Sequence, residues 1–106
     1  MRDALIAKAG RCEVCGRRKR GLACHEIARG PLRSLALDKP YAILVVCPPC
    51  HELVGDKASW PEPRQLAVLQ RRRPMDYNLV AYNELVNPRA PLRITQDEVD
   101  RYRRTK

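Results

Sequence analysis

The sequence predicts a small single domain of the α+β class, with a compact core followed by a helical C-terminal extension. The chain has 106 residues, which is the usual size of one domain. A continuous apolar run at 42–46 predicts a buried strand, whereas 77–86 carries apolar residues at helical spacing. We therefore divide the expected domain 1–106 into a core at 1–56 and a helical extension at 57–106.

Four of the five cysteines form two C-x-x-C pairs, Cys12 with Cys15 and Cys47 with Cys50. This spacing is typical of a four-thiolate zinc site with the first pair in a knuckle, and a disulfide framework is the alternative. The chain has no Phe and one Trp, so a structural zinc would supply folding energy that a small core lacks. Cys24 is left over, and we interpret it as a small buried hydrophobic residue.

The predicted elements of the first half are short and separated by turns. A capped helix is expected at 4–9, and alternating side chains predict a strand at 22–27. The β-branched run at 41–46 predicts a second strand, which leads directly into the second cysteine pair. Two prolines suit the first turn of a helix at 48–54, because their positions need no amide donor, and Gly55 ends that helix.

The second half is predicted to be helical. A helix is expected at 60–73, where a proline follows the last basic residue. Asp76 is expected to cap a helix at 77–86. A Thr-x-x-Glu capping box at 95–98 predicts a last helix at 96–104.

The chain is strongly basic, with 21 Lys and Arg against 12 Asp and Glu and a formal net charge of +9. A small basic domain rich in Arg indicates a nucleic-acid partner, and we expect DNA. The residues expected to contact its backbone are Arg17, Arg18, Lys19, Arg20, Arg29 and Arg33. For the run at 17–20, a solvated turn is the alternative interpretation.

The N-terminal stretch lacks the apolar region of a secretory signal, and no apolar run reaches the roughly 18 residues of a membrane span. We therefore expect a cytoplasmic protein without a membrane partner, in which paired thiols favour metal over disulfides.

Residues 11–56 resemble the HNH endonuclease family. The resemblance rests on the two C-x-x-C pairs, on the strand motif His25-Glu26-Ile27 and on His51, which follows the last cysteine. It implies a treble-clef core, also called ββα-metal, in which zinc is structural. It also implies that a second divalent metal, Mg²⁺, Mn²⁺ or Ni²⁺, binds the scissile phosphate while a general base activates water. By analogy with the family, such a protein would process phage or bacterial DNA.

The strand motif aligns with the family in two ways. One alignment makes His25 a metal ligand and Glu26 the base, and the other makes Cys24 the ligand and His25 the base. His51 stands at a metal-ligand position of the helix in both.

The chain departs from the family at two positions. Ala42 stands where the family has Asn, and Gly55 stands where it has a second helix His, with Asp56 as an adjacent substitute. The resemblance thus implies His25, Glu26 and His51 as catalytic residues and His25, His51 and Asp56 as ligands of the second metal.

Two other functions fit the same residues. The first is a zinc-finger DNA-binding protein without catalysis, in which the histidines contact DNA or the zinc thiolates. The second is a protein-interaction module that docks through the helices after Trp60. We interpret Trp60 and the tyrosines as core residues rather than as groups that stack on bases.

Overall fold

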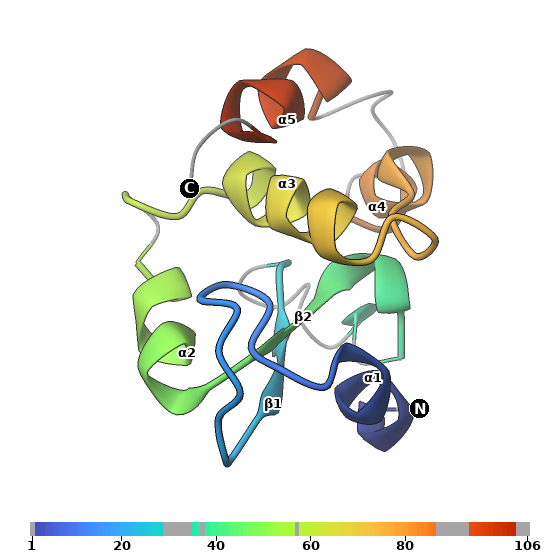
Figure 1. Ribbon diagram of the computed structural model, residues 1–106. Coiled ribbons are helices and arrows are strands. Elements are labelled where there is room, and N and C mark those ends of the chain that lie inside the picture. Colours follow the sequence, from blue (N-terminus) through green and yellow to red (C-terminus); the bar gives the residue numbers. More distant parts are fainter. Residues whose placement is uncertain (1, 29–34, 37, 57, 87–93, 104–106) are drawn as a thin grey trace.

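The computed structural model describes residues 2–28, 35–36, 38–56, 58–86 and 94–103. The described part is a small α+β structure with one two-stranded sheet, which confirms the predicted class (Figure 1). Its elements in chain order are α1 (Arg2–Ala9), β1 (Ala23–Glu26), the 3₁₀ turn η2 (Pro40–Ala42), β2 (Ile43–Val46), α2 (Pro48–Val54), α3 (Glu62–Arg72), α4 (Leu79–Val86) and α5 (Gln96–Arg103). Helices α3, α4 and α5 lie together at one end of the molecule, and the sheet, α1 and α2 lie at the other (Figure 1).

The sheet pairs β1 and β2 in antiparallel register, with Ala23 opposite Val46 and Glu26 opposite Ile43. Every residue of β2 is buried, because both of its faces are covered. Leu44 and Val46 belong to the main core, whereas Ile43 and Val45 pack in a smaller cluster with α1. A strand covered on two faces needs a continuous apolar run rather than an alternating one.

The second strand begins later than the sequence predicts. Its expected span was 41–46, but Pro40–Ala42 forms a 3₁₀ turn and β2 is Ile43–Val46. The fixed φ of Pro40 suits the first position of such a turn. Helix α2 starts at Pro48, directly after Cys47, and its cap is Gly55, as predicted.

The α4 cap is a correction to the sequence prediction. Asp76 was expected to cap a helix at 77–86, but α4 starts at Leu79. The cap is Asn78, whose Oδ1 accepts the backbone N–H of Ala81 at 3.0 Å. Asp76 instead pairs with Arg73, at 2.8 Å between carboxylate oxygen and Nη1. The buried guanidinium of Arg73 therefore binds the carboxylate that the sequence pattern assigned to the N-terminus of α4.

The capping box of α5 is confirmed, since Thr95 Oγ1 accepts the backbone N–H of Glu98 at 3.2 Å and Glu98 Oε1 accepts that of Thr95 at 3.1 Å. Helix α5 packs on α3, and its Val99 is fully buried.

The main hydrophobic cluster contains residues from both halves of the chain. Cys12 and Val46 from the first half share it with Leu66, Tyr82 and Val99 from the second. Trp60 is also buried in it, in agreement with a core role, and Arg64 stacks over its ring at 3.7 Å. Cys24 is buried in the smaller cluster with Leu5, as a small hydrophobic residue would be. Among the described helices, none has the length and apolar character needed to span a bilayer.

Candidate metal centre and histidine pair

The four cysteines of the two C-x-x-C pairs converge, although the pairs are far apart in sequence. The Sγ atoms of Cys12, Cys15, Cys47 and Cys50 all lie within 4.8 Å of one another. The Cys15 and Cys47 sulfurs are 3.9 Å apart. A tetrahedral zinc with Zn–S bonds of about 2.3 Å requires sulfurs about 3.8 Å apart. The four thiols therefore fit a structural metal such as zinc.

A tight knuckle positions the first pair. The backbone N–H of Gly16 donates to the Cys12 carbonyl at 2.9 Å, and Gly16 has φ of 75°, which favours glycine. The Cys15 N–H points at the Cys12 sulfur at 3.5 Å. On the other side, Cys47 is the N-cap residue of α2 and Cys50 lies in its first turn. The loop and the helix thus present their thiols to one point.

The thiols differ in acidity. Burial acts to raise the pKa of Cys12, but N–H groups of Cys15, Cys47 and Val14 outweigh it and lower that pKa to about 7. Burial and the hydrogen bonds with Cys47 and Cys12 raise the pKa of Cys50 well above its ordinary value. Binding of a metal to four thiolates must therefore release protons.

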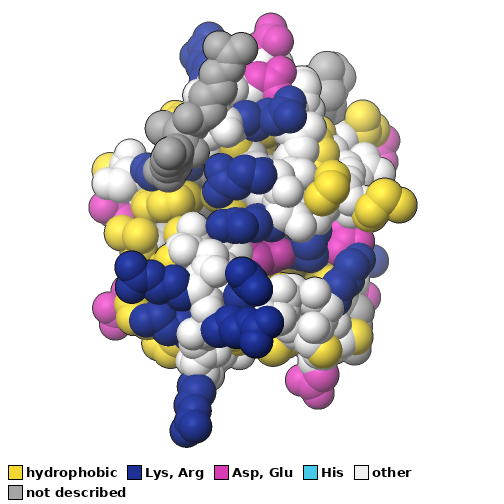
Figure 2. All heavy atoms as spheres, in the orientation of Figure 1, with side chains coloured by type: hydrophobic (Ala, Val, Ile, Leu, Met, Phe, Trp, Pro, Cys, Tyr) yellow, Lys and Arg dark blue, Asp and Glu magenta, His cyan; other side chains and the backbone are white. Residues whose placement is uncertain are grey.

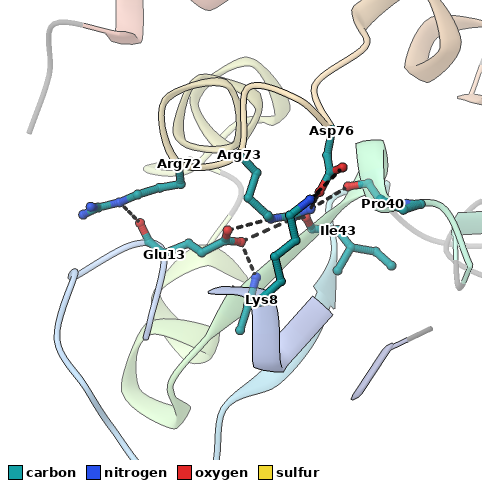
Figure 3. A network of polar contacts seen from close by, with 8 residues as sticks. Lys8, Glu13, Pro40, Ile43, Arg72, Arg73 and Asp76 are labelled. Atoms are coloured by element: carbon teal, nitrogen blue, oxygen red, sulfur yellow. Dashed lines mark hydrogen bonds and ion pairs between the residues drawn. The ribbon is translucent and has the colours of Figure 1, made fainter. Parts of the chain in front are cut away.

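A buried ion pair anchors the knuckle to the rest of the molecule (Figure 3). Glu13, inside the first C-x-x-C, is 2% exposed, and its Oε2 accepts from Arg73 Nε at 2.6 Å. Its Oε1 accepts the backbone N–H of Val45 at 2.7 Å. Arg73 also donates to the backbone carbonyls of Ile43 and Pro40. The carboxylate and the guanidinium are thus both saturated, as a buried charge pair requires.

Two further cations extend this network. Lys8 on α1 reaches Asp76 at 3.3 Å, and Arg72 Nε donates to the Glu13 carbonyl at 2.9 Å. Burial acts to raise the pKa of Asp76, but Arg73 and Lys8 outweigh it and lower that pKa. Helix α1, the knuckle and the end of α3 are therefore tied together by charged groups.

The only two histidines of the chain meet in the structure. His25 on β1 and His51 on α2 lie edge to face, with ring centroids 5.2 Å apart and planes at 74°. His51 is exposed and His25 is half-buried. The pair therefore has one ring open to solvent and one held by the fold.

Gln65 on α3 fixes His25. It is fully buried, and its Nε2 donates to the carbonyls of Val54 at 3.2 Å and Trp60 at 2.9 Å. Its Oε1 must then accept, and it lies 2.9 Å from His25 Nε2. In the neutral ring, His25 therefore carries its proton on Nε2 and its lone pair on Nδ1. Sequence reasoning missed Gln65, because a polar residue in an amphipathic helix carries no local sign of a buried partner.

The remaining predicted residues are placed as follows. Alternation in β1 puts Glu26 on the face of Cys24, opposite His25. Asp56 is exposed, and its Oδ1 accepts the N–H of Ala58 at 3.1 Å. Within the described ranges, the four cysteines are the one group of three or more possible ligands that converges, so His25, His51 and Asp56 do not gather as a three-ligand set.

The predicted phosphate contacts are exposed where the structure describes them. Arg17, Arg18, Lys19 and Arg20 are all exposed in the loop after the knuckle. Arg29 and Arg33 lie outside the described residues. Lys and Arg side chains cover much of the face that Figure 2 shows, acidic ones are sparser, and no histidine is visible on it.

Comparison of the chain with protein-family models, with curated proteins and with solved structures finds no match. The four-cysteine geometry and the histidine pair are therefore the basis for any functional proposal.

Proposed function

We propose that the chain is an HNH-like, metal-dependent DNA endonuclease built on a treble-clef zinc domain. The observation that carries the proposal is the contact between His25 and His51, with ring centroids 5.2 Å apart. These are the only histidines of the chain, and they come from the strand and the helix that the family resemblance names. The order β1, β2, α2, with two zinc cysteines at the start of α2, supports the treble-clef core.

The hydrogen bond that His25 donates to Gln65 supports a chemical role for His25. A base that takes a proton from water, and a metal-ligating imidazole, both need one nitrogen with a lone pair and a partner for the other. The Gln65 acceptor, 2.9 Å from Nε2, provides that arrangement for Nδ1. Since β1 alternation turns Glu26 to the opposite face, the geometry favours His25 over Glu26 as the base.

His51 is the exposed member of the pair and the better placed one for a metal ligand. A divalent metal held by His51 would polarise the scissile phosphate, while His25 acts as the base. Within the described residues, no third His, Cys, Asp or Glu side chain joins the two histidines, so with His25 as the base the remaining metal ligands would have to be water and phosphate oxygens.

A plasmid-nicking assay tests the proposal. Zinc-loaded protein, free of other metals, is incubated with supercoiled DNA and Mg²⁺, Mn²⁺ or Ni²⁺. We expect nicking that falls by about 10²–10⁴-fold in His25→Ala, because a general base contributes that much. His51→Ala should also abolish it, while zinc content and circular dichroism stay unchanged. Glu26→Gln is the matched control, and its loss of nicking would move the base to Glu26.

A second candidate function, DNA binding without cleavage, is favoured by a separate observation. The four exposed cations at 17–20 form no ion pair within the described part of the chain, so their charge is available to phosphate. Binding should then weaken with salt, with a slope of about −0.9 per phosphate contact on logarithmic axes. Salt-dependent binding by wild-type protein that nicks with none of the three metals contradicts the nuclease and selects this function. Absence of DNA binding at low salt would point to a protein partner instead.

A further inference from the structure

A pocket opens beside the Glu13–Arg73 pair, between α1, the knuckle and the turn after α3. Figure 3 shows this pair, with Lys8 and Arg72 on opposite sides of it. Its volume of about 430 Å³ falls within the range of small-ligand sites. It is lined by Lys8, Ala9, Arg11, Glu13, Arg72, Arg73, Pro74 and Met75. Neither His25 nor His51 is among these residues, so the pocket is separate from the histidine pair.

The lining has a strong positive excess. It carries four cations against the single carboxylate of Glu13, which leaves a formal charge of +3. That carboxylate is already occupied by Arg73 and by the N–H of Val45. Asp76, which is outside the lining, pairs with two of the four cations, Arg73 and Lys8, so Arg11 and Arg72 carry the remaining positive charge. The pocket therefore offers positive charge that its own acids do not neutralise.

The guanidinium of Arg72 is fixed in place while part of it stays available to a ligand. Its Nε is fixed by the Glu13 carbonyl at 2.9 Å, and its two Nη groups point away from the buried pair (Figure 3). The guanidinium lies over Gly16, where a Cβ would come within 2.9 Å of Nη2, so the glycine leaves room for it. Arg11, exposed beside Cys12, contributes a second cation, and neither it nor the Arg72 Nη groups contact a carboxylate within the described ranges.

We propose that this pocket binds a phosphate group, with the Arg72 fork and Arg11 as the cations that contact it. A planar guanidinium with two free N–H groups matches phosphate oxygens in a bidentate way. The phosphate belongs either to the backbone of a nucleic acid or to a chain end. The proposal stands apart from cleavage, since the pocket can hold phosphate whether or not the histidine pair cuts DNA.

Three probes distinguish the sources of the phosphate: inorganic phosphate, and one short single-stranded oligonucleotide with and without a 5′-phosphate. Each is titrated into zinc-loaded protein, and binding is followed by calorimetry and by the backbone amide signals of Arg11 and Gly16. Dependence on the 5′-phosphate identifies a chain-end site, and equal binding of both oligonucleotides identifies a backbone site. Either result supports the proposal.

The double variant Arg11→Gln/Arg72→Gln should weaken binding of the preferred probe by about tenfold or more, since each charged hydrogen bond contributes substantially. The matched control, Arg101→Gln/Arg103→Gln, removes the same charge from exposed positions on α5. Equal affinity of the pocket variant and wild type, or equal losses in the two double variants, would overturn the proposal.

A second variant tests the pocket without replacing Arg72, whose hydrogen bond to the Glu13 carbonyl also stabilises the knuckle. Met75 lines the pocket and is 90% exposed, so we expect its replacement to leave folding intact. Met75→Glu should weaken phosphate binding, and Met75→Gln should not. His25→Ala serves as the link to the proposed nuclease, because it should remove nicking and leave phosphate binding intact. Failure of one proposal is thereby separated from failure of the other.

Discussion

At the scale of single residues, Gln65 both stabilises the fold and fixes the tautomer of His25. Its two donations to backbone carbonyls leave Oε1 as an acceptor for His25. Gln65→Leu should destabilise the fold by about 2 kcal/mol or more, because buried carbonyls and the imidazole N–H lose their partners. It should also shift His25 toward a mixture of tautomers. Urea unfolding and the ¹⁵N shifts of the His25 ring measure the two effects.

Gln70→Leu on the same helix is the control for this prediction. Gln70 is partly exposed and contacts Gln96 rather than His25, so the substitution should leave the His25 ring signals unchanged. An unchanged tautomer in Gln65→Leu would contradict the role assigned to Gln65.

The sequence predicts the role of a residue where that role follows from the spacing of nearby residues. It does not predict which distant residues contact it. The cluster of four cysteines that fits a metal follows from two C-x-x-C pairs, and the core role of Trp60 follows from composition. Gln65 lies 40 residues from His25, and Arg73 lies 60 residues from Glu13. Such pairings depend on tertiary packing, and the hydrophobic periodicity of a sequence predicts only its helices and strands.

At the scale of elements, boundaries moved where a tertiary contact competed with a local signal. Asp76 carries the sequence pattern of a helix cap, yet Arg73 and Lys8 bind it and Asn78 caps α4. The burial of β2 was predicted correctly, although the strand starts at Ile43 rather than at 41, because its apolar run is long enough to identify a buried strand without knowledge of its neighbours.

The junction of α1, α3 and α4 at Asp76 predicts a pH dependence of stability. The folded pKa of Asp76 lies below its unfolded value of about 3.9. The pair therefore contributes stability above that pH and loses it as the pH falls through the lower folded pKa. Asp76→Asn should cost about 1–2 kcal/mol at neutral pH, and the difference from wild type should vanish at low pH. Urea unfolding over this pH range measures the difference.

Asp100→Asn is the matched control, since the Asp100–Arg103 pair on α5 is about half exposed at both side chains. Exposed pairs contribute little, so its difference from wild type should stay near zero across the range. An Asp76→Asn penalty that persists unchanged to low pH would contradict the ion-pair assignment.

At the scale of the whole molecule, the metal site and the hydrophobic core are one structure. Cys12, Cys47 and Cys50 belong to the same cluster as Leu66 and the residues around it. The knuckle supplies two of the four clustered thiols, and its Glu13 also pairs with Arg73. Loss of the metal should therefore destabilise the helical half of the chain as well as the first half.

Cys47→Ser tests this coupling. A structural zinc contributes on the order of 10–16 kcal/mol of apparent binding energy, far more than a small domain's net stability. The variant, or wild-type protein with a chelator, should lose both zinc and the cooperative unfolding transition, including the α3–α5 amides in hydrogen exchange. Cys24→Ser makes the same substitution at a buried cysteine outside the metal cluster, and it should keep zinc and cooperativity. A folded, cooperative and zinc-free Cys47→Ser protein would show that hydrophobic packing alone holds the domain, with the metal serving another purpose.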